Sequence, residues 1–185
     1  MQGHVCRDIF NVKHTECEFI LNSRQIAVVG ILSAVYALTT VMLGELGYSW
    51  IQVRISESLT PLPYIFGGYA VVGLTLGVLI ANLFSPVGLP DIIFGPFLTL
   101  IAAFLSWRFN FNRRLVACIY PVVINALGVS AYVAGFYGVP YPASVLSIGI
   151  GELISAVIVG YPLLRALEKS PIIRLLETGK GERES

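Results

Sequence analysis

Residues 51–63 place Gln52, Arg54 and Glu57 between long segments that are almost entirely apolar. A guanidinium followed three residues later by a carboxylate can receive a polar ligand through charge-assisted hydrogen bonds. The same two residues could instead cap a helix end. Because charges set among apolar segments are costly and generally mark functional positions, we interpret this stretch as part of a ligand-binding site.

Four more polar residues interrupt the apolar runs further along the chain: Asn82, Asp91, Asn125 and Glu152. Carboxylates and amides supply the acceptors and donors that orient a small polar ligand. Carboxylates and amides also have simpler structural roles. A carboxylate such as Asp91 is favourable at a helix N-terminus, and an amide such as Asn125 can bond a neighbouring helix. Glu152 could simply pair with Arg54.

The composition predicts an integral membrane protein. Of its 185 residues 56% are hydrophobic and only 12% are charged, and the mean hydropathy is +0.78. A bilayer core needs about 20 apolar residues per helix, so a single domain of about six spans is the most that the chain can hold. We expect no nucleic-acid partner, and the three cysteines, an odd number, predict no disulfide framework.

Six apolar segments can be distinguished, which predicts an all-α bundle of six transmembrane helices between two charged tails. The second segment is short because Pro61 and Pro63 prevent a straight span, so we expect it to be a short or broken helix. The others are residues 25–43, 69–84, 91–107, 115–134 and 145–167. We expect tails over residues 1–23 and 169–185 and the membrane domain over residues 24–168.

The Lys and Arg residues are distributed unevenly between the two ends of such a bundle. If both termini lie on one side, every Lys and Arg except Arg54 falls on that side, which is therefore predicted to be cytoplasmic. Arg54 is then outside. The seven polar residues named above converge on the outer half of the bundle, where we expect them to line a cavity in the cell membrane that opens outward.

Two other features concern possible metal and partner sites. The N-terminal tail holds His4-x-Cys6 and His14-x-x-Cys17, but this spacing fits no standard zinc pattern, and we predict no metal site. In the first apolar segment Gly30, Ala34 and Ala37 place small residues along one face, where another helix can approach closely. Ordinary packing within the chain is an equally good explanation of this face.

Three stretches in this order carry a resemblance: Gln52-Val-Arg-Ile-Ser-Glu57, the run that ends in Ala81-Asn82-Leu83, and Asp91-Ile-Ile-Phe-Gly-Pro96. Together they resemble the QueT family, whose members are taken to be substrate-binding S components of energy-coupling factor (ECF) transporters for queuosine precursors. The resemblance implies a six-helix S component that binds its ligand from outside. It also implies docking through the first helix onto a membrane T component driven by two ATPase subunits. The sequence has no Gly-x-x-x-x-Gly-Lys-Ser/Thr loop, so ATP is expected to be a cofactor of the partners only.

A 7-deazaguanine ligand suits the polar residues. Its N–H edge can donate to a carboxylate, for which we favour Glu152 together with Asn125, and a cationic aminomethyl substituent would need a second acid, Glu57 or Asp91. Three aromatic residues could stack on the ring, although the membrane interface is the commoner place for such residues. They are Trp50, Tyr132 and Tyr141.

Other functions stay open at this level. An enzyme is not expected, because both histidines lie in the tail and no nucleophile and base can meet within the spans. A stand-alone ion-coupled carrier could use Glu57, Asp91 and Glu152 as a relay, but the cytoplasmic halves hold almost no ionisable groups to complete it. An S component for another vitamin-like molecule is the remaining alternative.

Overall fold

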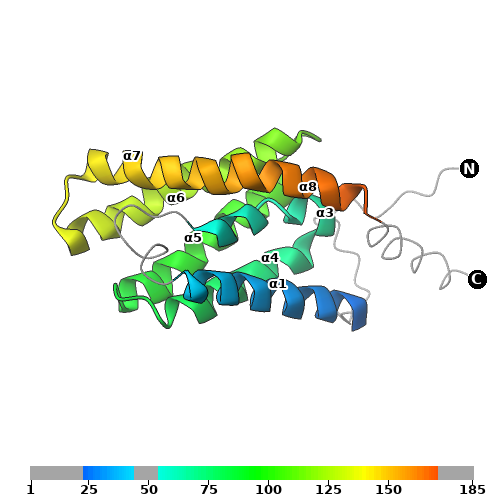
Figure 1. Ribbon diagram of the computed structural model, residues 1–185, viewed down its shortest axis with the longest axis horizontal. Helices are drawn as coiled ribbons and strands as arrows, with labels where there is room; N and C mark the ends of the chain where they lie inside the picture. Colours follow the sequence, from blue (N-terminus) through cyan, green and yellow to red (C-terminus); the bar gives the residue numbers. More distant parts are fainter. Residues whose placement is uncertain (1–22, 44–53, 171–185) are drawn as a thin grey trace, which may run out of the picture.

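The computed structural model describes residues 23–43 and 54–170, and all regular elements within these ranges are helical. The elements are α1 (Ser23–Met42), the 3₁₀-helix η1 (Ile55–Leu59), α3 (Pro63–Phe66), α4 (Gly68–Asn82), α5 (Leu89–Arg108), α6 (Arg114–Tyr137), α7 (Tyr141–Glu152), the π-helix η2 (Leu153–Val159) and α8 (Gly160–Glu168). Together α7, η2 and α8 form one long rod that lies along α6 (Figure 1). The start of α1 and the end of α8 lie at the same end of the bundle (Figure 1).

Four helices in the described residues are long and apolar enough to cross a membrane: α1, α5, α6 and the α7–α8 rod. This confirms an all-helical, multi-pass membrane protein. The six-span count is not established. Helix α4 has 15 residues, or roughly 22 Å of length, which is shorter than a bilayer core of about 30 Å.

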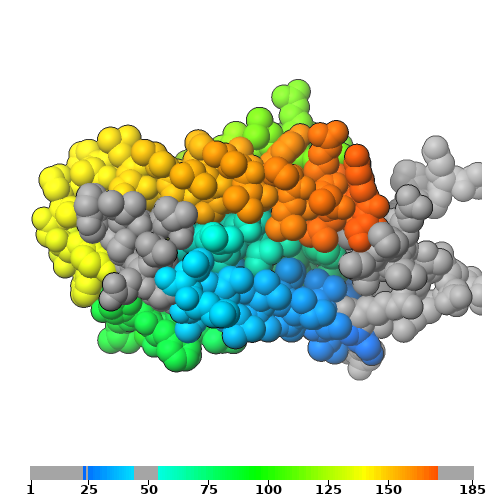
Figure 2. Space-filling view, in the orientation of Figure 1, coloured from blue at the N-terminus to red at the C-terminus, as the bar shows by residue number. Residues whose placement is uncertain are grey.

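The predicted second segment is broken, as its prolines indicated. It consists of η1 and α3, and α3 ends at Gly67, which has a φ of +79°. Neither piece is long enough to span. The segment lies between α1 and the α7–α8 rod (Figure 2), and it buries the polar residues Ser56, Glu57 and Ser58. A backbone without long helices is tolerated at this depth because protein, rather than lipid, surrounds it.

The last segment is longer than predicted and contains a π-helical turn. It begins at Tyr141, and the π-helix follows directly after Glu152. Where α8 begins, Gly160 approaches η1 so closely that a Cβ would lie 3.0 Å from the carbonyl oxygen of Ser58. The rod therefore packs directly on the broken segment.

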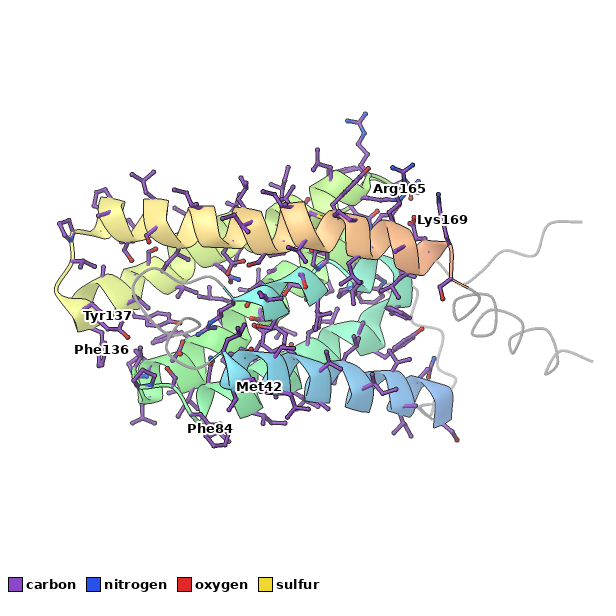
Figure 3. The ribbon with its side chains drawn as sticks, viewed as in Figure 1. Met42, Phe84, Phe136, Tyr137, Arg165 and Lys169 are labelled. Atoms are coloured by element: carbon purple, nitrogen blue, oxygen red, sulfur yellow. The ribbon has the colours of Figure 1, made fainter. Side chains whose placement is uncertain are left out.

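The cationic side chains of the last helix lie at one end of the bundle. Arg165 and Lys169 lie at the end where α8 finishes, and Phe136 and Tyr137 lie at the other (Figure 3). Arg114, at the start of α6, joins the cationic end through an ion pair of 2.6 Å with Glu168. This is the charge asymmetry that the sequence predicted, and it is typical of membrane proteins.

Helices α1 and α4 approach closely through Gly73 and Gly77. A Cβ on Gly77 would lie 2.9 Å from both the carbonyl oxygen of Ser33 and the Cβ of Tyr36, and a Cβ on Gly73 would lie 2.9 Å from the carbonyl oxygen of Val29. This spacing of glycines allows two helix backbones to pack together within a membrane. The pair α1–α4 is thus fixed by backbone contact.

We predict that Gly77→Ala lowers the stability of the protein by about 1–3 kcal/mol, because the new methyl group meets backbone that cannot rotate away. Thermal unfolding of the purified protein in detergent measures this. Gly30→Ala is the matched control, since nothing lies within 4 Å of a Cβ at Gly30. Equal unfolding temperatures for the two variants would show that α1 and α4 do not need this close approach.

Candidate ligand-binding site

Six of the seven predicted site residues are buried in the interior of the bundle, and each is at most 5% exposed. They are Arg54, Glu57, Asn82, Asp91, Asn125 and Glu152. Gln52 lies outside the described residues. Burial of this many polar groups in an apolar bundle is costly unless each finds a partner. Their partners therefore define the site.

The Arg54 guanidinium is paired with Asp91. Arg54 Nη2 lies 3.4 Å from Asp91 Oδ2, and the Tyr132 hydroxyl donates a 2.6 Å hydrogen bond to Asp91 Oδ1. The structure thus joins the start of η1 to α5 and α6 through one carboxylate. Asp91 is in the first turn of α5 but makes no side-chain cap there. Its place in the first turn agrees with the simpler explanation, a carboxylate favoured by the helix dipole, and the ion pair with Arg54 is an additional interaction.

Asn82 positions Asp91. Its Nδ2 donates a 2.7 Å hydrogen bond to the backbone carbonyl oxygen of Asp91, while its Oδ1 is buried without a hydrogen-bond partner. The amide occupies the space above Gly95, where a Cβ would lie 2.1 Å from Asn82 Nδ2. Asn82, predicted as a ligand-binding residue, thus holds the end of α4 to the first turn of α5.

Glu57 is held by two hydroxyl groups. The Tyr36 hydroxyl donates to Glu57 Oε1, and Thr60 donates to Oε2 at 2.6 Å. Nearby, Thr40 donates to the Ser56 hydroxyl at 2.7 Å. Sequence reasoning missed Tyr36 and Thr40. The sequence feature that could have identified them is their spacing of four residues in an otherwise apolar helix, which places both on one face.

Glu152 and Asn125 meet as predicted. Asn125 Nδ2 donates a 3.0 Å hydrogen bond to Glu152 Oε1, whereas Glu152 Oε2 is buried with no hydrogen-bond partner. The π-helical turn that follows is a feature often found at functional sites. Glu152 is therefore the carboxylate with capacity to bind something else.

Several other buried polar atoms lack hydrogen-bond partners. Besides Asn82 Oδ1 and Glu152 Oε2, they are the hydroxyl groups of Ser130, Ser144 and Ser155. Native proteins leave few such groups unsatisfied, so these five atoms require an explanation. A bound polar ligand would satisfy some of them.

Carboxylates outnumber cations in the described interior. Arg54 is the buried cation, and Glu57, Asp91 and Glu152 are the buried acids. If all are ionised, the interior carries a net negative charge that favours a ligand with N–H donors or a positive charge. Among the described residues, no three His, Cys, Asp or Glu side chains are placed to hold a metal ion. The His and Cys residues of the tail lie outside those residues, and Cys118 is a buried free cysteine.

The aromatic candidates differ in position. Tyr132 is bonded to Asp91, and its ring stacks on Phe94 with centroids 6.0 Å apart. Tyr141 is exposed and donates to the carbonyl oxygen of Leu127, which fits a residue at the membrane interface. Trp50 lies outside the described residues. Of the three aromatic candidates, Tyr132 is therefore the one that the described structure brings to the site, where it joins Tyr36.

The predicted docking face is only partly on the surface. Gly30 and Ala34 are exposed on α1, but Ala37 is 7% exposed and faces the interior. Ala37 follows Tyr36 directly and shares its buried side, so it cannot reach a partner helix. The exposed small-residue face consists of Gly30 and Ala34.

A multi-pass helical bundle whose polar interior holds one unsatisfied carboxylate is the architecture of a membrane protein that binds and moves a polar solute. The chain belongs to the QueT transporter family, which matches residues 26–169. A transport role, rather than catalysis, follows from this membership. Neither a curated protein nor a solved structure shows significant similarity to the chain.

We predict that Gly95→Ala disturbs the Asp91 anchor, because the added methyl group occupies the position of the Asn82 amide. Displacement of that amide should lower stability by about 1–3 kcal/mol. Thermal unfolding in detergent is the measurement. Gly135→Ala in α6 is the matched control, since a Cβ there meets nothing within 4 Å. The role of Asn82 is refuted if both variants unfold at the wild-type temperature.

Proposed function

We propose that this chain is the substrate-binding S component of an ECF transporter that imports a queuosine precursor of the 7-deazaguanine type. The observation that carries the proposal is the unpaired Oε2 of Glu152, buried beside Asn125 in a member of the QueT transporter family. An unsatisfied carboxylate oxygen in an apolar bundle has a strong preference for an N–H donor. The Watson–Crick edge of a deazaguanine offers such donors.

The charge of the interior supports a ligand with a cationic substituent. Asp91 is already paired with Arg54. Glu57 accepts hydrogen bonds from two hydroxyl groups, which carry no charge and leave its negative charge uncompensated. An aminomethyl group on the base would therefore offset the negative charge of Glu57 and Glu152. Tyr132, next to Asp91, is placed at the edge of this network and can contact the ring system of the ligand.

The transporter would be completed by a T component and two ATPase subunits. The exposed face of α1 with Gly30 and Ala34 supports docking there, because small residues permit close helix approach. Beside this face lies a wholly apolar groove of about 440 Å³ between α1, the η1–α3 segment and α8, to which Ala27, Ile31 and Val35 contribute. A helix of the T component could use both features. In this arrangement the cationic end of the bundle is cytoplasmic.

Uptake of a radiolabelled aminomethyl-deazaguanine by cells or vesicles tests the proposal. We expect the chain alone to bind the compound without transporting it, and the chain with its T and ATPase partners to import it on ATP hydrolysis. Unaided uptake would instead support an ion-coupled carrier. Binding of another vitamin-like compound, with no affinity for deazaguanines, would retain the S-component role and refute the substrate.

We predict that Glu152→Gln weakens binding of the aminomethyl-deazaguanine by about two to three decades, or about 3–4 kcal/mol. Asn125 donates to Oε1, so the glutamine must keep its oxygen there and present its NH₂ group where Oε2 was. A donor then faces the N–H donors of the ligand. Isothermal titration with the purified protein measures the change.

Glu168→Gln is the matched control for this substitution, because it removes a carboxylate from the same rod at a partly exposed ion pair with Arg114. Its binding constant should equal that of the wild type. Near-wild-type binding by Glu152→Gln would assign Glu152 to helix packing and transfer recognition of the base to Glu57 or Asp91.

We predict that Gly30→Leu and Ala34→Leu each prevent assembly with the T component, because added bulk on this face holds the helices apart. Ligand affinity should be unchanged, since both residues point away from the polar interior. Co-purification with the T and ATPase subunits is the measurement. Ala143→Leu, which adds the same bulk to an exposed position on α7, should assemble normally. Assembly by both α1 variants would place the docking surface on another helix.

A further inference from the structure

Helix α1 has two different faces that serve two different surroundings. Gly30 and Ala34 are exposed on one face, whereas Tyr36 and Thr40 are fully buried on the other. Successive residues in a helix are rotated by about 100°, so Ala34 and Tyr36 point in nearly opposite directions. The helix therefore connects the proposed docking surface with the polar interior.

The inner face of α1 is bonded to the broken segment at two points. Tyr36 donates to Glu57 Oε1, and Thr40 donates to the Ser56 hydroxyl. Both acceptors belong to η1, which has only five residues and is too short to be held by its own hydrogen bonds. The position of Glu57 thus depends on α1.

The Tyr36 hydroxyl has little freedom to adjust independently of the helix. Its ring is 0% exposed and packs in a core cluster with Val71, Leu74 and Val78 of α4. The backbones of α1 and α4 are in close contact at Gly77, next to Tyr36. A shift of α1 relative to η1 must therefore move, strain or break the bond between Tyr36 and Glu57.

The element that holds Glu57 packs on the rod that holds Glu152. Element η1 packs against η2, which begins directly after Glu152. It also meets the start of α8, where a Cβ on Gly160 would lie 3.0 Å from the carbonyl oxygen of Ser58. Tyr36 of α1, Glu57 of η1 and the rod that carries Glu152 are therefore linked by one hydrogen bond and by the packing of η1 on the rod.

We propose that Tyr36 is a positioning residue that couples occupancy of the ligand site to docking of the T component on α1. The proposal rests on the function proposed above. When α1 is displaced by its partner, the Tyr36 hydroxyl repositions Glu57 and changes ligand affinity. By thermodynamic linkage, the ligand must change the affinity for the partner by the same factor.

The experiment measures this coupling factor. The dissociation constant of the full-length protein for its purified T–ATPase complex is determined in nanodiscs, with and without saturating aminomethyl-deazaguanine. We expect the ligand to change the wild-type constant by about 5-fold or more. Tyr36→Phe keeps the buried ring and removes only the hydroxyl group. In this variant we expect the ratio of the two dissociation constants, without and with the deazaguanine, to fall to near one.

Two control variants distinguish loss of coupling from a change in ligand affinity and from a nonspecific effect of removing a hydroxyl group. Thr39→Val removes a hydroxyl group of α1 that bonds only backbone carbonyls of its own helix, at Val35 and Tyr36, so it should keep the wild-type ratio. Tyr132→Phe removes the hydroxyl group on Asp91, away from α1, and should weaken ligand binding without changing the ratio. Thermal unfolding confirms that each variant is folded.

If Tyr36→Phe does not fold, Thr40→Val takes its place. This variant removes the second bond between α1 and η1, and the same loss of the ratio is expected.

The possible failures can be told apart. If the wild-type chain binds neither the deazaguanine nor the T–ATPase complex, the proposed function fails and the coupling fails with it. If it binds both with a ratio of one, or if Tyr36→Phe keeps the wild-type ratio, the coupling through Tyr36 is refuted while the transporter function stands. Loss of the ratio in Thr39→Val as well would show that any hydroxyl group on α1 has this effect.

Discussion

The structure depends on one constraint, the need to satisfy four ionisable side chains inside an apolar helical bundle. Arg54 and Asp91 neutralise each other, and Tyr132 donates to the same carboxylate. Glu57 is surrounded by hydroxyl donors. Glu152 alone among these four keeps a buried oxygen without a hydrogen-bond partner. Because an unsatisfied buried carboxylate is unfavourable in a medium of low dielectric constant, the interior is complete only when something binds there.

The same constraint explains where the backbone departs from regular α-helix. The 3₁₀-helix η1 contains Glu57, and the π-helix η2 follows Glu152 directly. Irregular backbone within a membrane is tolerated only where protein or a cavity surrounds it, and it exposes groups that a regular helix would conceal. The two irregular elements pack against each other, and Ser58 of η1 also meets Gly160, the first residue of α8. Structural irregularity is thus concentrated at the proposed ligand site, while the long helices α1, α5 and α6 provide the membrane-spanning frame.

In the coupling that we propose, helix α1 both forms part of the membrane-spanning frame and responds to the partner. Contact with α4 through glycine fixes its position, its inner hydroxyl groups hold η1, and its outer small residues leave space for another helix. A ligand can affect partner binding only if it interacts differently with two arrangements of such an element. The short η1 segment, held mainly by its neighbours, is the element that can change between the two.

The sequence by itself determined the class of the protein and most of its polar site. Hydropathy requires a membrane bundle, and the prolines at 61 and 63 require a break in the second segment. Rarity of charge also identified the residues, since Arg54, Glu57, Asp91 and Glu152 stand out among apolar neighbours and are all found buried. These inferences succeed because they depend on the transfer of single residues from water to lipid, which needs no knowledge of neighbours.

Only the tertiary structure decided which groups meet. The pairing of Arg54 with Asp91, the bond from Tyr36 to Glu57 and the inward position of Ala37 depend on how helices rotate and pack. Sequence spacing gives the faces of a helix but does not say which face its neighbours cover, so it grouped Ala37 with Gly30 and Ala34 although Ala37 is buried. The π-turn after Glu152 was likewise not predicted from the sequence. The partner of each buried polar side chain depends on contacts between segments that are distant in the chain, and such contacts exist only in the folded protein.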